Sequence, residues 1–209
     1  MASHTNNVAG LVLAGGQSKR MGRHKALVEV GGLPLLARAC DLVKSAGGSV
    51  AVSVREEGPV AELAVSLGVT VVFDLPGSPA AALCGIVAGL LWAKSVGAGS
   101  MLTIPCDVPL LPADLPGRLI AAVVDAPCAA ARTSRGVEPL CAIWRTEAIA
   151  VLQEECRAER QAPLHEILRK MQAAFVDCAD PANFLNINTP QDVMLAEALM
   201  RDRGVAGGS

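Results

Sequence analysis

The sequence has few aromatic residues and no strong net charge of either sign. Aromatic side chains make up 2% of the 209 residues, and tyrosine is absent. Proteins that bind single-stranded nucleic acid commonly stack bases on aromatic side chains, so this composition argues against that class. The formal net charge of −2 gives no overall attraction to nucleic acid or to an anionic membrane. Neither is expected as a partner, and binding of phosphates must depend on a local basic segment.

The cysteines do not have the pattern of a zinc site or of a disulfide framework. There are seven, they are widely scattered, and no two have C-x-x-C spacing. Reduced thiols that act mostly as small core residues are expected, as in cytoplasmic proteins.

Long hydrophobic runs of the kind that make signal peptides or membrane spans are also missing. Met1 to Asn7 is short and polar, without the apolar core of a signal peptide. The uncharged stretch from Leu75 to Ala93 is broken in its first half by prolines and glycines, which leaves too little for a span. A soluble cytoplasmic protein is predicted.

What the sequence does have is an alternation of short β-rich runs and longer helical patterns. Strands are expected over residues 8–13, 49–54, 70–73, 100–104, 128–131 and 139–144, and helices over residues 34–46, 60–67, 85–94, 114–124, 146–155, 164–171 and 190–200. Most strand runs are apolar at successive positions, which indicates that both faces are covered. This predicts an α/β, three-layer Rossmann-like fold with a mainly parallel central sheet. One domain over residues 8–200 is expected, with flexible ends at 1–7 and 201–209.

The loop after the first expected strand is rich in glycine and in basic residues. It begins Ala14-Gly15-Gly16, and four basic side chains follow within seven residues: Lys19, Arg20, Arg23 and Lys25. Adjacent glycines let backbone N–H groups approach an anion closely, and Gly22 permits a second tight turn. Because ligands of α/β sheets bind beyond the carboxyl ends of strands, the segment from Leu13 to Lys25 is interpreted as a triphosphate site. The alternative is an ordinary solvated turn.

Two familiar phosphate-binding motifs do not fit this loop. A P-loop requires G-K-[ST], whereas Gly22 is followed by Arg23 and His24. The dinucleotide-binding motif requires G-x-G-x-x-G directly after the strand, and Gly15-Gly16-Gln17 does not supply it.

A second candidate residue is Asp107, which follows an apolar run and lies between Pro105 and Pro109. The prolines restrict the backbone on both sides of the carboxylate. A single carboxylate near phosphates is a common way to hold Mg²⁺, with substrate oxygens and waters as the other ligands. A turn or helix-capping aspartate is the alternative, and from these residues alone both interpretations stay open.

Near the C-terminus, the run from Asn186 to Pro190 combines a helix start with two further polar residues. Thr189 is suited to the N-cap, Pro190 to the first helical position and Asp192 to the first turn. Asn186 and Asn188 are not needed for the helix. In an extended segment their alternation makes both side chains point the same way.

Together these segments resemble the signature of molybdenum cofactor guanylyltransferases, the MobA family of nucleotidyltransferases, whose core is Rossmann-like. The resemblance rests on L-A-G-G-x-S-x-R-M-G-x-x-K from Leu13 to Lys25, on P-C-D-x-P around Asp107 and on N-x-N-T-P from Asn186. It spans roughly residues 8–199. The family usually has aspartate where His24 stands. A histidine there could orient the loop by hydrogen bonding but has no fixed negative charge, and as a lone histidine it is expected to be solvated.

The resemblance implies a role for each motif. Arg20, Lys25 and Asp107 would be catalytic, Asp107 would hold Mg²⁺, and Asn186 and Asn188 would face the acceptor or the metal. The residues implied to bind the nucleotide are Leu13, Ala14, Gly15, Gly16, Gly22, Lys25, Ser53, Asp74, Gly85 and Asp107, with Gly85 opening a helix toward it.

By the same resemblance, the reaction is transfer of GMP from GTP to the phosphate of molybdopterin, with release of pyrophosphate. GTP and molybdopterin are the implied partners, together with molybdenum-insertion or molybdoenzyme maturation proteins. A cytidylyltransferase acting on the same pterin is the nearest alternative, although such proteins tend to have Ala-Ala-Gly in place of Ala14-Gly15-Gly16. A transferase for another acceptor, such as a sugar phosphate, and a non-catalytic nucleotide-binding module are further alternatives.

Overall fold

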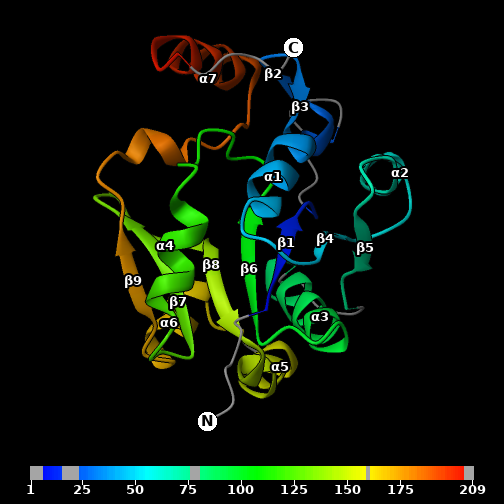
Figure 1. Cartoon of the computed structure of the whole chain (residues 1–209), viewed down its shortest axis with the longest axis vertical. Helices are drawn as coiled ribbons and strands as arrows, with labels where there is room; N and C mark the ends of the chain where they lie inside the picture. The colour runs from blue at the N-terminus through cyan, green and yellow to red at the C-terminus, as the bar shows by residue number, and fades with distance from the viewer. Residues whose placement is uncertain (1–6, 16–23, 76–80, 159–160, 205–209) are drawn as a thin grey trace.

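The computed structural model describes residues 7–15, 24–75, 81–158 and 161–204, and a seven-stranded sheet forms its centre (Figure 1). The strand order is β5-β4-β1-β6-β8-β7-β9. β8 is antiparallel to its neighbours β6 and β7, whereas the other neighbouring pairs are parallel. The strands are β1 (Val8–Leu13), β4 (Val50–Val54), β5 (Thr70–Phe73), β6 (Ser100–Pro105), β7 (Cys128–Thr133), β8 (Gly136–Arg145) and β9 (Ala174–Asp177). The mainly parallel sheet predicted from the sequence is confirmed.

Helices cover both faces of this sheet, which explains the continuous apolar strands. The main helices are α1 (Leu35–Lys44), α2 (Pro59–Ser66), α3 (Ala81–Ser95), α4 (Leu115–Ala122), α5 (Ile149–Arg157), α6 (Leu164–Lys170) and α7 (Pro190–Asp202). One core cluster joins α1, α2 and α4 to one face, and a second joins α3, α5 and α6 to the other. Successive residues of β1 contribute to opposite clusters, Val12 to the first and Leu11 and Leu13 to the second.

A third, smaller cluster lies at the end of the molecule where α7 packs on a short hairpin (Figure 1). The hairpin consists of β2 (Glu29–Val30) and β3 (Leu33–Pro34). Val28, Val30 and Leu35 pack there with Ile187 and residues of α7. This packing brings the segment before α7 close to the segment that leads into the hairpin.

Several elements differ from the sequence-based expectation. α3 begins at Ala81, so Gly85 lies inside its first turns and does not open it. The helix expected over residues 146–155 is a 3₁₀ turn, η2 (Thr146–Ala148), followed by α5. The hairpin, β9 and the 3₁₀ turns η1 (Lys25–Leu27) and η3 (Pro181–Phe184) were not expected, because elements of two to four residues carry little periodic signal. No helix among the described residues is long and apolar enough to cross a membrane.

Candidate active site

The predicted site segments meet at one edge of the sheet, where parallel strands β1, β4, β5 and β6 end. Leu13, the last residue of β1, lies opposite Ser53 of β4 and Pro105 of β6. Backbone hydrogen bonds between these strands continue just past the strand ends. The Ala14 N–H donates to the carbonyl of Ser53 at 3.0 Å, and the Cys106 N–H donates to the carbonyl of Leu13 at 3.1 Å. Strand pairing therefore brings the residues after β1, β4 and β6 together.

Lys25 is the centre of a polar cluster at this edge. Its Nζ donates to Oδ2 of Asp107 at 2.8 Å and to Oδ1 of Asn188 at 2.5 Å. The Lys25 and Asp107 side chains are only 16% and 20% exposed. Three residues that the sequence placed in different motifs are thus in direct contact, and the ammonium group is held between two oxygen atoms of the kind that hard cations prefer.

The start of α7 holds Asn188 in place. The carboxylate of Asp192 accepts hydrogen bonds from the N–H groups of Asn188 and Thr189, both at 2.8 Å, and the Thr189 hydroxyl accepts from the Asp192 N–H, which completes a capping box. The N–H of Ile187 also donates to the carbonyl of Asp107 at 2.8 Å. The helix start expected over Thr189 and Pro190 is confirmed. Its additional effect is to anchor the segment that carries Asn188.

A second polar group lies at the ends of β4 and β5. The Ser53 hydroxyl donates to Oδ1 of Asp74, and Gly15 and Gly85 lie against this pair. A Cβ atom on Gly85 would be 2.5 Å from Ser53 Oγ and 3.0 Å from Asp74 Oδ1, so the helix backbone approaches as closely as it does only because residue 85 is glycine. On Gly15, a Cβ would be 3.1 Å from Asp74 Oδ2. These contacts join the four residues into one surface.

Burial raises the pKa of the Asp74 carboxyl above its usual value, while the hydrogen bond from Ser53 and the charge of Arg55 act in the opposite direction. A half-buried carboxylate with one oxygen already accepting a hydrogen bond is suited to accept another from an N–H or O–H of a ligand.

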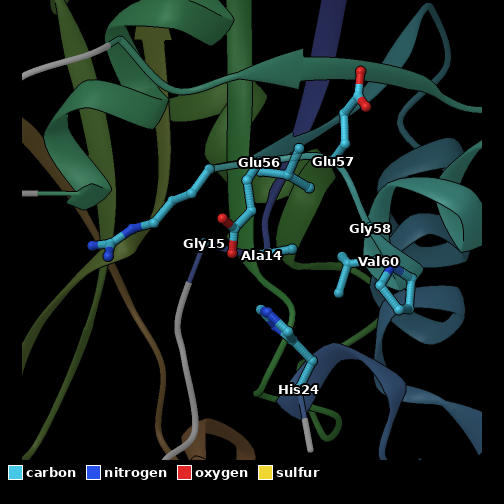
Figure 2. A pocket seen from close by; sticks show the side chains of 10 residues that line it. Ala14, Gly15, His24, Glu56, Glu57, Gly58 and Val60 are labelled. Atoms are coloured by element: carbon cyan, nitrogen blue, oxygen red, sulfur yellow. The ribbon is translucent and has the colours of Figure 1, made fainter.

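A pocket of about 110 Å³ adjoins the first residues of the loop (Figure 2). It is lined by Ala14, Gly15, His24 and residues 54–60. The Glu56 carboxylate and the His24 imidazole point into it from opposite sides, whereas Glu57 points away. His24 is half-buried, and its Nδ1 is shielded from solvent without a hydrogen-bond partner in the described part of the chain. His24 and the β4–α2 connection line the same pocket, so the imidazole is only partly exposed to solvent.

Four predicted site residues remain, and three of them cannot be placed. Gly16, Arg20 and Gly22 lie outside the described residues. Asn186 is exposed, two residues before Asn188. Of the two asparagines, Asn188 is the one that contacts Lys25.

Sequence reasoning missed the hydrogen bond by which Asp192 holds Asn188, and it missed the position of Glu56 beside the pocket. The sequence identified Asp192 as a residue of the first helical turn, but no motif shows that its carboxylate also holds Asn188. Glu56 follows β4 in a run of two glutamates, which reads as an ordinary surface loop. Its position near Gly15 depends on the order of the strands in the sheet, which the sequence does not specify.

The donor set fits a divalent cation held jointly by protein and substrate. Asp107 offers a carboxylate and Asn188 an amide oxygen, and both already bind the cationic Lys25. Among the residues that the structure describes, there is no group of three or more His, Cys, Asp or Glu side chains placed to hold a metal. A cation at Asp107 would therefore depend on phosphate oxygens and water for its remaining ligands, as is usual for Mg²⁺.

Comparison with known proteins decides the family. Residues 10–175 match the MobA-like NTP transferase domain. The chain belongs to this family. It is 36% identical to the molybdenum cofactor guanylyltransferase of Rhodobacter capsulatus over 195 residues, which cover 93% of this chain and 97% of the relative. The molybdenum cofactor guanylyltransferase of Rhizobium meliloti strain 1021 is 31% identical over 206 residues, with 94% and 93% covered. The resemblance inferred from the three motifs is confirmed, and the protein is a nucleotidyltransferase.

Solved structures agree on the fold. A molybdopterin-guanine dinucleotide biosynthesis protein A from Archaeoglobus fulgidus superposes with a TM-score of 0.72 at 20% identity, over 93% of this chain and 99% of that one. A nucleotidyl transferase from Methanothermobacter thermautotrophicus superposes with a TM-score of 0.75 at 17% identity, over 95% and 99%. The three-layer α/β architecture is therefore that of known nucleotidyltransferases.

Proposed function

We propose that the protein transfers GMP from GTP to the terminal phosphate of molybdopterin and releases pyrophosphate, in molybdenum cofactor biosynthesis. The observation that carries the proposal is the contact of Lys25 with Asp107 and Asn188 at the end of the glycine-rich loop. Relatives that share this chain over nine-tenths of its length are guanylyltransferases of that cofactor. The ammonium group of Lys25 is suited to binding the phosphates of a triphosphate, and the carboxylate of Asp107 and the amide oxygen of Asn188 are suited to its metal ion.

The nucleoside would lie beside Ser53, Asp74 and Gly85, with the phosphates directed toward Lys25. The Asp74 carboxylate would accept a hydrogen bond from a nucleoside N–H or O–H, and guanine offers two neighbouring donors, N1–H and N2–H. Leu13, Ala14 and Gly15 supply backbone next to this surface. Arg20, Gly16 and Gly22 are assigned to the phosphates by the resemblance of the loop.

The reaction needs little proton transfer from the protein. The acceptor phosphate is already ionised near neutral pH, so an attack on the α-phosphorus requires no general base. Lys25 would neutralise the negative charge that builds on the bridging oxygens, and Asn188 would orient Lys25. Mg²⁺ bound at Asp107 would supply charge neutralisation at the phosphates. Asp107 would hold the ion, and the pairing of β1 with β6 fixes its position relative to Leu13 at the start of the loop.

A nucleotide screen tests the proposal. The purified protein is incubated with Mg²⁺, molybdopterin and each of GTP, CTP, ATP and UTP, and pyrophosphate release is followed. Release that requires both GTP and the pterin is expected. A clear preference for CTP would overturn the guanylyl assignment, and release with a sugar phosphate in place of the pterin would overturn the acceptor. Tight GTP binding without pyrophosphate release would instead indicate a non-catalytic module.

A further inference from the structure

Two cysteines that take no part in the proposed reaction lie in contact with each other, and one of them is next to Gly85 in the sequence. Gly85 belongs to the surface that it forms with Gly15, Ser53 and Asp74, which is called the nucleotide surface below. Cys84 is in the first turn of α3 and Cys156 is near the end of α5, and their Sγ atoms are 3.7 Å apart although 72 residues separate them in the sequence. α3 and α5 pack side by side in the second core cluster (Figure 1). The pair is therefore a product of tertiary packing, and no spacing in the sequence indicates it.

The two thiols differ in access. Cys84 is buried, at 2% exposed, whereas Cys156 is the one cysteine of the seven that is half-buried. An oxidant from solvent would consequently reach Cys156 first, and the buried partner would be in position to react with the product. The five other cysteines are buried, so the same oxidant has poorer access to them.

Cys84 also has a direct connection to the nucleotide surface. It precedes Gly85, whose backbone packs so closely on Ser53 and Asp74 that a Cβ there would be 2.5 Å from the Ser53 hydroxyl oxygen. A disulfide requires a sulfur–sulfur distance of about 2 Å, so the two atoms must approach by roughly 1.7 Å. Any part of this movement that the backbone of α3 takes up would change the contact of Gly85 with Ser53 and Asp74.

We propose that Cys84 and Cys156 form a reversible disulfide under peroxide and that this disulfide weakens nucleotide binding at the adjacent surface. The effect on GTP rests on the proposed function, whereas formation of the bond does not. Hydrogen peroxide oxidises the Cys156 thiolate to a sulfenic acid and is reduced to water. The Cys84 sulfur then attacks the Cys156 sulfur, the S–S bond forms, and the sulfenic oxygen leaves as a second water molecule. A dithiol reductant restores both thiols.

The surroundings make this reaction slow. Burial, together with the neighbouring Cys84 thiol, raises the pKa of Cys156 to about 12, and the charge of Arg157 offsets this only in part. Because the thiolate is the reactive form, the pair responds to sustained peroxide and not to brief exposure. This slow response separates it from a sensor built on a low-pKa thiol.

Peptide mapping tests the bond itself. The full chain is treated with hydrogen peroxide, unreacted thiols are blocked, and peptides are compared with and without reductant. A peptide pair joining Cys84 to Cys156 is expected in the wild type and in Cys128→Ala, which removes a buried cysteine of β7. It is absent from Cys156→Ser. If the wild type yields sulfinic acid at Cys156, or other cysteine pairs, without this cross-link, the proposal is overturned.

Equilibrium GTP binding tests the consequence. Oxidation is expected to raise the dissociation constant for GTP about fivefold or more in the wild type and in Cys128→Ala, with recovery after reduction, and to leave Cys156→Ser unchanged. A complete cross-link with unaltered GTP affinity would overturn the coupling. If the reduced protein binds no GTP, the proposed function fails and the coupling to GTP fails with it, while the mapping result still decides the disulfide.

Discussion

The ammonium group of Lys25 lies 2.8 Å from the carboxylate of Asp107, although 82 residues separate the two in the sequence. Lys25 begins η1 at the end of the loop after β1, and Asp107 follows β6, the strand paired with β1. The lysine therefore neutralises the carboxylate that is proposed to hold the metal. The same side chain is proposed to bind phosphate when GTP arrives.

This competition predicts opposite effects of Lys25→Met on metal and nucleotide. Removing the ammonium leaves the Asp107 carboxylate without its cation, so the nucleotide-free variant should bind Mn²⁺ more tightly than the wild type does, as measured by calorimetry. Its KM for GTP should rise by about tenfold or more, because one charge on the phosphates is no longer neutralised. Lys44→Met, on an exposed lysine of α1, serves as control and should change neither quantity. Weaker Mn²⁺ binding in Lys25→Met would contradict the competition.

Asp107→Ala should abolish metal-dependent turnover. The carboxylate is the protein ligand proposed for Mg²⁺, and its loss should lower kcat/KM by about 100-fold or more. The matched control is Asp114→Ala, which removes an exposed aspartate at the start of α4. Its ion pair with Arg118 is long, with Oδ2 at 3.8 Å from Nη1. Circular dichroism should show that both variants fold. Turnover by Asp107→Ala at the wild-type rate would refute the assignment of this residue.

Asp192 is expected to act on the reaction through Asn188. Asp192→Ala removes the acceptor of two N–H groups, so it should reduce the free energy of unfolding by about 0.5–2 kcal/mol. It should also raise the KM for GTP, since Asn188 is then free to move away from Lys25. The decisive measurement is the same substitution in an Asn188→Ala background. There the loss of stability should persist while the further rise in KM disappears.

The stability of the Asp192 cap should depend on pH in a definite direction. Hydrogen bonds from the Asn188 backbone and from Thr189 hold the pKa of Asp192 below its usual value. The carboxylate therefore stabilises the folded state above the unfolded-state pKa, near 3.9, and this contribution is lost as the pH falls through the lower folded-state value. Asp202→Ala, at the exposed C-terminal end of the same helix, is the control for the free energy of unfolding and for the KM for GTP.

The sequence predicts the part of the site that depends on strand ends. Leu13 is the last residue of an apolar strand, and Asp74 and Asp107 each follow one. The carboxyl ends of such strands meet at one edge of the sheet when the strands are parallel. Asn188 is different, because its bond to Lys25 spans 163 residues and depends on how α7 docks on the β2–β3 hairpin. Strands of two residues have no periodicity that could reveal this packing.

The start of α3 shows a second limit of sequence reasoning. The family resemblance implies that Gly85 opens a helix toward the nucleotide. The helix instead begins at Ala81, and Gly85 is accommodated inside it. A glycine is needed at this position for a steric reason. The side chains of Ser53 and Asp74, which lie outside the helix, would be too close to any larger residue. Such a reason becomes visible only when β4, β5 and α3 are placed together.

Asp74 provides a prediction in which affinity and stability change with pH in opposite directions. Burial raises the folded-state pKa of its carboxyl. Protonation therefore favours the fold, and this contribution is present below the unfolded-state pKa and is lost as the pH rises through the folded-state value. Nucleotide binding is expected to favour the ionised form, which accepts a hydrogen bond from the nucleoside, so affinity should weaken as the pH falls.

The comparison that checks this uses Asp74→Asn, whose amide does not titrate. The phosphates of GTP also gain protons on acidification, but they do so equally for both proteins. The ratio of the KM of the wild type to that of the variant should therefore rise from pH 7 to pH 5, and the rise should begin at a higher pH than for an ordinary aspartate. Over the same range, the free energy of unfolding of the wild type should increase relative to that of the variant. A constant KM ratio would show that the Asp74 carboxylate does not contact the nucleotide, whereas a constant stability difference would show that its burial does not shift its titration.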